Sequence, residues 1–119
     1  MKYFKKEEFA CNCGCGRNKI NVEDFVDLLD DARHRAGVIF KITSGYRCPI
    51  KNRSVGGSST SSHLKGLAAD IAVPNSHMRY RILWGLLTAG FDRIGIGSNF
   101  IHADTDDSKV EGVIWDYYD

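Results

Sequence analysis

The sequence predicts an α+β fold in which two or three helices pack on a mainly antiparallel sheet. Two segments carry apolar residues at helical spacing, and five short apolar or β-branched runs indicate strands. The last three runs follow one another too closely for helical crossovers, which favours antiparallel pairing. The length suits one domain, so we expect a single domain over residues 1–119, with a cysteine-rich segment 1–20 packed on it.

The first half of the chain should form a helix, a strand and a long loop. We expect the helix over residues 21–36, with Asn21 as its N-cap and Gly37 ending it. The β-branched run 38–43 indicates a strand. Residues 44–65 show neither helical nor strand periodicity, and a loop of that length is often functional.

The second half should supply the buried strand, a second helix and the remaining strands. Residues 67–73 are apolar except for Asp70 and indicate a buried strand. A helix is expected over 76–89, followed by Gly90 and with Trp84 in the core. The final strands are expected at residues 93–97, 100–105 and 110–118, joined by hairpins.

Two features of the sequence leave alternatives open. We assign Trp115, Tyr117 and Tyr118 to sheet packing, with a wall of a substrate groove as the alternative. The cysteines allow reduced or partly paired structural thiols, which we favour, or two disulfides, or a thiolate metal site. These four cysteines are Cys11, Cys13, Cys15 and Cys48. Their spacing differs from that of common zinc knuckles.

The charge balance and the absence of long apolar runs limit the partners. Lys and Arg total 16 against 15 for Asp and Glu, so we expect no nucleic-acid partner. No apolar run approaches the roughly 18 residues of a membrane helix, and residues 1–12 lack the apolar run of a secretory signal. We therefore expect a soluble protein without membrane insertion, and we also expect a monomer. If the substrate lies outside the cytoplasmic membrane, another protein must bring the two together, or a signal has been removed.

Three residues of ligand type point to a metal centre. Asp70 in an apolar strand costs several kcal/mol unless hydrogen bonds or a positive charge compensate it. His63 stands seven residues earlier, at the end of the polar loop, and His102 lies on a later strand, on the same face as Asp104. Nitrogen and oxygen ligands suit zinc, and three of them leave the fourth tetrahedral position for water. The sequence thus predicts one catalytic Zn²⁺ on His63, Asp70 and His102.

The long loop and the strand after it also resemble a known family. The segments SGYRCP at 44–49, VGG at 55–57 and SSHLKGLAADI at 61–71, together with Asn52, resemble the signature of D-Ala-D-Ala metallopeptidases. That family includes zinc D,D-carboxypeptidases, D,D-dipeptidases, phage endolysins that cut L-Ala-D-Glu bonds, and the related hedgehog signalling domain. The resemblance covers residues 42–104 and implies a hedgehog/DD-peptidase-like fold.

The resemblance also implies an activity and residue roles. It makes His63, Asp70 and His102 the zinc ligands, assigns Arg47 to the scissile carbonyl or a substrate carboxylate, and places Ser61 near the metal. The implied reaction is hydrolysis of peptidoglycan stem peptides, as a D,D-carboxypeptidase or an L-Ala-D-Glu-type endopeptidase acting on the cell wall. Phage lysis and a bacterial cytoplasmic dipeptidase both fit this reading.

The sequence departs from the family at the general base. Asn99 stands where many members have a glutamate, and Phe100 stands where others have a histidine. Asp104 is our candidate for the base, with orientation of a ligand imidazole as the alternative role. The missing glutamate also leaves a second function open, that of a catalytically silent zinc-containing module that binds cell wall or a protein partner.

Overall fold

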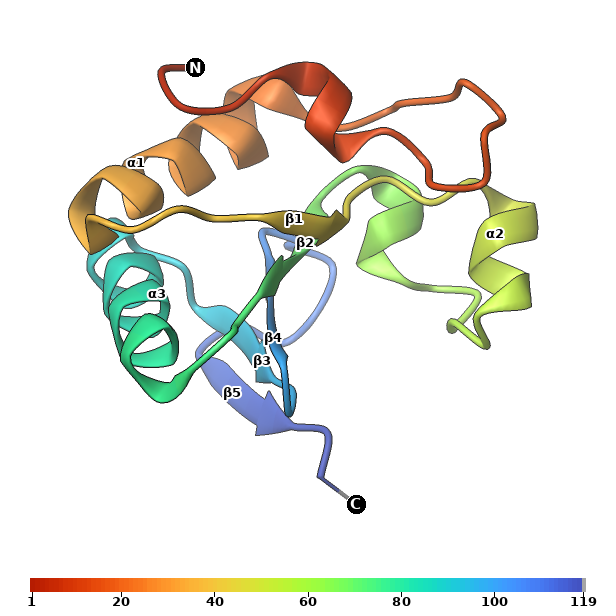
Figure 1. Cartoon of the computed structure of the whole chain (residues 1–119). Helices are drawn as coiled ribbons and strands as arrows, with labels where there is room; N and C mark the ends of the chain where they lie inside the picture. Colours follow the sequence, from red (N-terminus) through yellow and green to blue (C-terminus); the bar gives the residue numbers. More distant parts are fainter. Residues whose placement is uncertain (119) are drawn as a thin grey trace.

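Two amphipathic helices pack side by side on one face of a five-stranded sheet in the computed structural model, which describes residues 1–118 (Figure 1). The elements in chain order are η1 (Lys6–Phe9), η2 (Val22–Val26), α1 (Asp27–Ala36), β1 (Ile42–Ser44), α2 (Pro49–Ser54), η3 (Ser62–Lys65), β2 (Ala68–Ala72), α3 (Ser76–Ala89), β3 (Arg93–Ile96), β4 (Phe100–Asp104) and β5 (Val113–Asp116). The strand order is β1-β2-β4-β3-β5, and every pair is antiparallel except β3 with β5. The predicted α+β fold class is confirmed.

Local capping fixes both long helices where the sequence predicted them. The Asn21 side chain accepts a hydrogen bond from the Asp24 amide, and the first turn, η2, is π-helical before α1 continues. Gly37 ends α1 in the left-handed conformation, at φ 69°. Asn75 caps α3 in the same way as Asn21, and Gly90 ends it at φ 110°.

The core lies between the two helices and one face of the sheet. Ile71 of β2 and Ile101 of β4 are fully buried and pair with each other across the strands. Gly85 lets α3 approach α1 closely, because a Cβ there would lie 2.4 Å from the carbonyl oxygen of Ala32. The sheet is thus covered on this side, and its other face is left for the site.

Two parts of the first half differ from expectation. The strand expected at 38–43 is confined to β1, since residues 38–41 carry the chain from α1 to the sheet edge, and Ile39 is 68% exposed. The expected loop 44–65 contains α2 and η3. No usual capping residue marks the start of α2 in the sequence. Its N-cap is Cys48, whose sulfur accepts from the Lys51 amide, and cysteine is not among the usual N-cap residues.

The final strand also departs from the predicted hairpins. β3 and β4 form one, but β4 already has β2 on its other edge, so β5 pairs with the free edge of β3 and runs parallel to it. The expectation of a buried Trp84 was wrong as well. Its side chain lies on the outer side of α3, 40% exposed, with the Arg81 guanidinium 5.0 Å from its ring.

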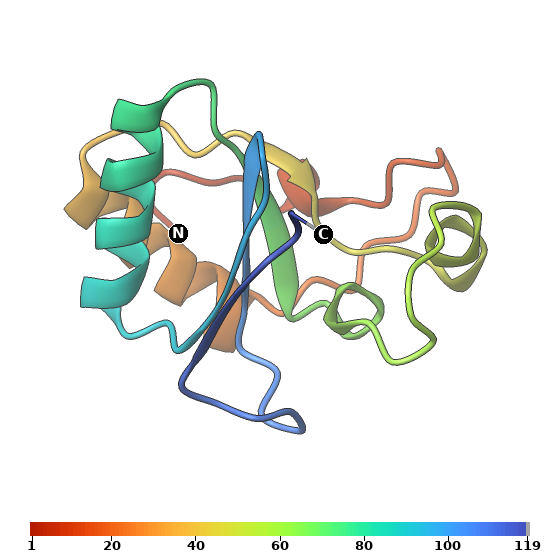
Figure 2. The ribbon, with the colours of Figure 1, turned by 90° about the horizontal axis from the view of Figure 1, so that it is seen from below.

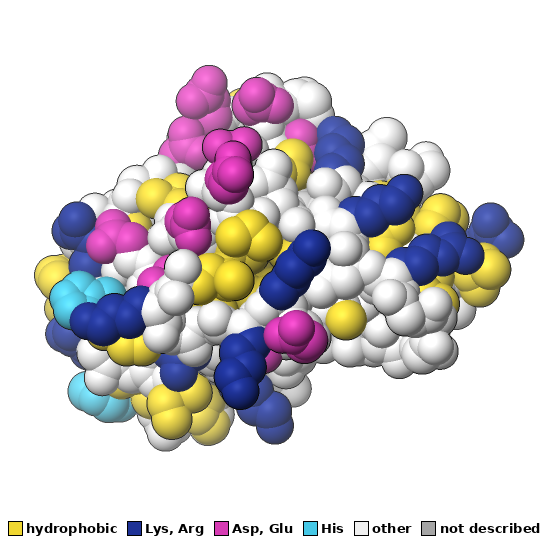
Figure 3. Space-filling model, turned by 90° about the horizontal axis from the view of Figure 1, so that it is seen from above, with side chains coloured by type: hydrophobic (Ala, Val, Ile, Leu, Met, Phe, Trp, Pro, Cys, Tyr) yellow, Lys and Arg dark blue, Asp and Glu magenta, His cyan; other side chains and the backbone are white. Residues whose placement is uncertain are grey.

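Different elements lie on the two sides of the sheet. Seen from below, α1 and α3 lie on one side of the strands, and α2 with its neighbouring loops lies on the other (Figure 2). The face that carries the N-terminal segment and α1 mixes acidic and basic side chains, with the acidic ones gathered toward one edge (Figure 3). Among residues 1–118, no helix is both long and apolar enough to cross a membrane.

Candidate metal centre

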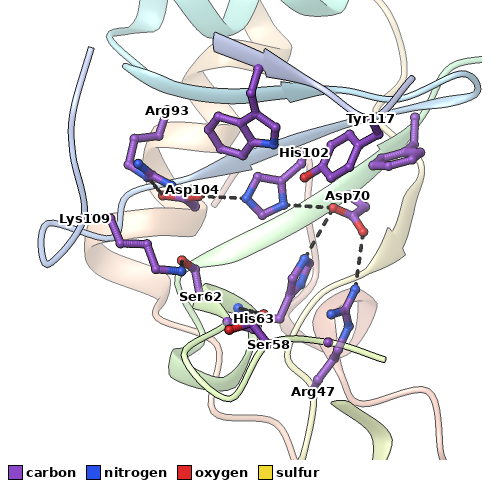
Figure 4. A pocket seen from close by; sticks show the side chains of 14 residues that line it. Arg47, Ser58, Ser62, His63, Asp70, Arg93, His102, Asp104, Lys109 and Tyr117 are labelled. Carbon is purple, nitrogen blue, oxygen red and sulfur yellow. Dashed lines mark hydrogen bonds and ion pairs between the residues drawn. The ribbon is translucent and has the colours of Figure 1, made fainter. Parts of the chain in front are cut away.

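A pocket of about 340 Å³ lies on the sheet face opposite α1 and α3 (Figure 4). Its floor is formed by β2 and β4, where alternate residues face away from the core. One wall comes from the segment that precedes β2 and the other from β5 and the residues after it. Every residue that the sequence assigned to the site lines this pocket, namely Arg47, Ser61, His63, Asp70, His102 and Asp104.

Three ligand-type side chains converge at the centre of the pocket. Asp70 and His102 are direct partners in the β2–β4 register, and His63 is brought alongside by η3. Oδ1 of Asp70 lies 3.1 Å from Nδ1 of His102 and 3.4 Å from Nε2 of His63. The three candidate ligand atoms all lie within 4.8 Å of one another. This separation and this donor set fit a single zinc ion.

Each imidazole is oriented by a contact on its other nitrogen. Nδ1 of His63 lies 2.8 Å from the carbonyl oxygen of Gly45 and must donate to it, because a carbonyl only accepts. Nε2 of His102 lies 2.7 Å from Oδ2 of Asp104. Such outer contacts fix the tautomer of a ligating histidine. They leave the lone pairs of His63 Nε2 and His102 Nδ1 directed toward Asp70.

The electrostatics of the cluster favour a positive charge between these groups. Burial would raise the pKa of Asp70, but contacts with His102 and His63 outweigh burial and hold this pKa below its ordinary range. Burial would lower the pKa of His102, whereas the carboxylates of Asp104 and Asp70 raise it, and the net shift is upward. A cation of any kind, proton or metal, is therefore stabilised at this point.

Asp104 is engaged by donors on several sides. Its side chain is 1% exposed and, besides His102, accepts from Arg93 Nε at 2.7 Å and from the Asp106 amide at 3.1 Å. Burial raises the pKa of Asp104, and the contacts with His102 and Arg93 lower it further than burial raises it. A carboxylate so occupied is a weak proton acceptor, so these contacts favour the orienting role over that of general base.

Arg47 and Ser61 approach the centre from the segment before β2. The Arg47 guanidinium points into the pocket, with Nη2 3.6 Å from Oδ2 of Asp70 and Nη1 3.3 Å from Oδ1 of Asn52. Ser61 is the N-cap of η3, and its hydroxyl accepts from the His63 amide at 3.3 Å. Ser61 therefore supports the turn that carries His63.

Two of the C-terminal aromatic residues, which we assigned to sheet packing, form a wall of the pocket, the alternative that the sequence left open. The Trp115 ring centroid lies 5.5 Å from that of His102, and both Trp115 and Tyr117 line the pocket. Gly95 permits this approach, because a Cβ there would lie 2.7 Å from Nε1 of Trp115. Tyr118 is not among the pocket residues, and its hydroxyl donates to the carbonyl oxygen of Gly97. The period-two spacing of positions 115 and 117 is the signal that indicates the shared face.

Sequence reasoning missed two cations that border the site. Arg93 bridges Asp104 and the Trp115 ring, with its guanidinium 5.0 Å from the ring centroid. Lys109 donates to the hydroxyl of Ser62 at 3.0 Å and lies 3.7 Å from the buried carboxylate of Asp106. Arg93 lies on a different strand from Asp104, and Ser62 is 47 residues before Lys109, so these contacts depend on the tertiary structure.

Asn99 lies outside the metal pocket. Asn99 lines a separate cavity of about 410 Å³ together with Ile39 and Met78, and its carbonyl oxygen accepts from the Val73 amide. The position where many resembling proteins have a glutamate is therefore directed away from the ligand cluster in this chain.

Comparison with protein-family models gives a match over most of the chain. The sequence model of the family described as Peptidase M15 matches residues 2–104. The matched range contains Arg47 and the three candidate ligands, whereas the aromatic wall at positions 115 and 117 lies beyond it. A search of curated proteins found no match.

Proposed function

Since this chain belongs to the peptidase M15 family, we propose that it is a zinc-dependent peptidase that hydrolyses D-amino-acid-containing bonds of peptidoglycan stem peptides. The observation that carries the proposal is the convergence of His63, Asp70 and His102 within 4.8 Å at the bottom of a pocket. Three protein ligands leave one position free, as in catalytic rather than structural zinc sites. A zinc ion held by these three residues would polarise the substrate carbonyl and lower the pKa of a bound water.

The chain's own residues hold and orient the reacting groups. Asp104 keeps the proton of His102 on Nε2, so that Nδ1 is free to ligate. Arg47 presents a planar fork of donors beside Asp70, and this geometry suits a carbonyl oxygen that gains negative charge or a peptide carboxylate. Arg47 is the cation of the pocket best placed for substrate, because Arg93 is held by Asp104 and Lys109 is held by Ser62 and Asp106.

The size and lining of the pocket support a short peptide substrate. Its volume of about 340 Å³ is at the low end of the roughly 300–1,000 Å³ range of ligand sites. Trp115 and Tyr117 offer apolar surface on one side, while Ser58 and Ser61 offer hydroxyls on the other. A stem peptide carries both small apolar side chains and carboxylates, which these two walls and Arg47 match.

The test is the release of new amines or dipeptides from purified peptidoglycan by the zinc-loaded protein. Parallel assays with stem peptides ending in D-Ala-D-Ala and with peptides containing L-Ala-D-Glu identify the bond. His63→Ala should abolish release, whereas His77→Ala, which changes an exposed histidine at the start of α3, should not. Binding of peptidoglycan without release, with zinc retained, would replace the enzyme by the silent binding module.

A further inference from the structure

The four cysteines meet at one point away from the catalytic pocket. Cys11, Cys13 and Cys15 lie on the loop after η1, and Cys48 is the N-cap of α2, 33 residues after Cys15 in the chain. The N-terminal loop lies against the start of α2 in Figure 1. All four sulfurs lie within 4.8 Å of one another, with Cys13 3.4 Å from Cys11 and 3.5 Å from Cys48.

This arrangement fits a tetrahedral thiolate site. A tetrahedron with zinc–sulfur distances of about 2.3 Å has sulfur–sulfur edges of about 3.8 Å. The distances of Cys13 from Cys11 and from Cys48, 3.4 Å and 3.5 Å, are slightly shorter than that edge, and no two of the four sulfurs are more than 4.8 Å apart. Two disulfides would instead require two pairs of sulfurs, each joined at about 2.0 Å. A tetrahedral metal site requires all four sulfurs to lie close together, whereas two disulfides require only that each pair does.

The backbone around the cluster is shaped to present sulfur. Gly14 and Gly16 adopt φ of 81° and 75°, which reverses the loop beside Cys13 and Cys15. The Cys48 amide donates to the sulfur of Cys11 at 3.4 Å, and the Arg17 amide donates to the sulfur of Cys15 at 3.5 Å. Amide donors to sulfur stabilise the charge that a thiolate carries.

The cluster also occupies a part of the molecule with little core of its own. Cys11, Cys48 and Tyr46 form a small buried group separate from the main core. Isolated hydrogen bonds also join the N-terminal segment to this region. The Tyr46 amide donates to the carbonyl oxygen of Phe9 at 2.8 Å, and Nδ2 of Asn12 donates to the carbonyl oxygen of Thr43 at 2.9 Å. A metal cross-link would supply the stability that packing does not supply here.

We propose that Cys11, Cys13, Cys15 and Cys48 bind a second, structural zinc ion as four thiolates. The thiols release their protons to the solvent on binding, and no electron transfer is involved. The closed set of four sulfurs leaves no position for substrate. Because Cys48 follows Arg47 directly, the ion also fixes the backbone from which Arg47 reaches Asp70.

Metal counting and sulfur-to-metal absorption test the proposal on the full-length protein. Reduced protein loaded with zinc should hold about two ions per chain, and Cys13→Ser and Cys15→Ser should each lower this to about one. Cys13 and Cys15 are exposed, so their replacement leaves the buried group intact. Asn12→Ala, which alters the same loop without removing a sulfur, should keep both ions.

Cobalt distinguishes the two centres. Cobalt-loaded wild type should show the intense thiolate-to-cobalt charge-transfer band in the near ultraviolet, Cys13→Ser should lose most of it, and His63→Ala should keep it. A zinc content unchanged in both cysteine variants, or four thiols that react freely in the zinc-loaded protein, would overturn the proposal. Two disulfides in the native mass spectrum would overturn it as well. None of these readouts depends on whether the histidine centre cuts peptides.

Discussion

Replacing Asp104 by asparagine tests how the outer contacts of the histidine centre set its zinc affinity. Oδ1 of Asp104 accepts from Arg93 Nε, and Oδ2 lies 2.7 Å from His102 Nε2. Asparagine keeps one oxygen for Arg93 but turns an amide NH₂ toward His102. Two donors then face each other unless the imidazole proton moves to Nδ1, the atom that faces Asp70. The ligand nitrogen would be blocked in that tautomer.

The expected loss follows from these contacts. Removing the orienting contact should weaken zinc binding about 100-fold, the upper end for such partners. At about 1.4 kcal/mol per tenfold, this equals about 2.8 kcal/mol of binding free energy. The free energy of unfolding should also fall by about 3 kcal/mol, because Arg93, with a side chain 12% exposed, loses its buried counter-charge.

Competition with a chelator measures the zinc affinity. The zinc-binding step that is missing from the titration of His63→Ala belongs to the histidine centre. Asp106→Asn is the matched control. Asp106 is also 1% exposed, but it is held by Ser62 and Lys65, so its replacement should lower stability and leave zinc affinity unchanged. Wild-type affinity in Asp104→Asn, or an equal loss in Asp106→Asn, would refute the reasoning.

Three further predictions address the reaction, the pH dependence and the fold. Arg47→Lys should keep the zinc content and lower kcat/KM on a stem peptide about 100-fold, because an ammonium lacks the planar fork of donors; an unchanged kcat/KM would remove Arg47 from the reaction. Burial raises the pKa of Asp106, but hydrogen bonds from Ser108, Ser62 and Lys65 outweigh it and lower this pKa. The Asp106 carboxylate should therefore stabilise the fold fully above about pH 4 and lose this contribution as pH falls through its lower folded pKa. The difference in the free energy of unfolding in urea between wild type and Asp106→Asn should then become smaller on acidification. A difference that becomes larger at low pH would contradict this prediction. Gly85→Ala should lower the free energy of unfolding in urea by about 2 kcal/mol through overpacking of α3 on α1, and an unchanged value would show that the helices can separate at no cost.

Local signals in the sequence located most of the elements. Asn21 and Gly37 bracket the first helix, and Ser76–Ala89 forms a helix as its periodicity predicted. The alternation along β4 placed His102 and Asp104 on one face, and the structure has both in the pocket. These features depend on hydrogen bonds and side-chain directions within a few residues, which the sequence determines directly.

Pairings between distant segments were decided only by the tertiary structure. β5 pairs in parallel with the outer edge of β3, and this pairing brings Trp115 close to His102. The Arg93–Asp104 ion pair and the approach of Cys48 to Cys13 likewise join residues from different elements. Loop closure and strand order set these contacts, and both depend on the whole chain. The sequence by itself therefore determined the candidate ligands, while the fold decided what surrounds and orients them.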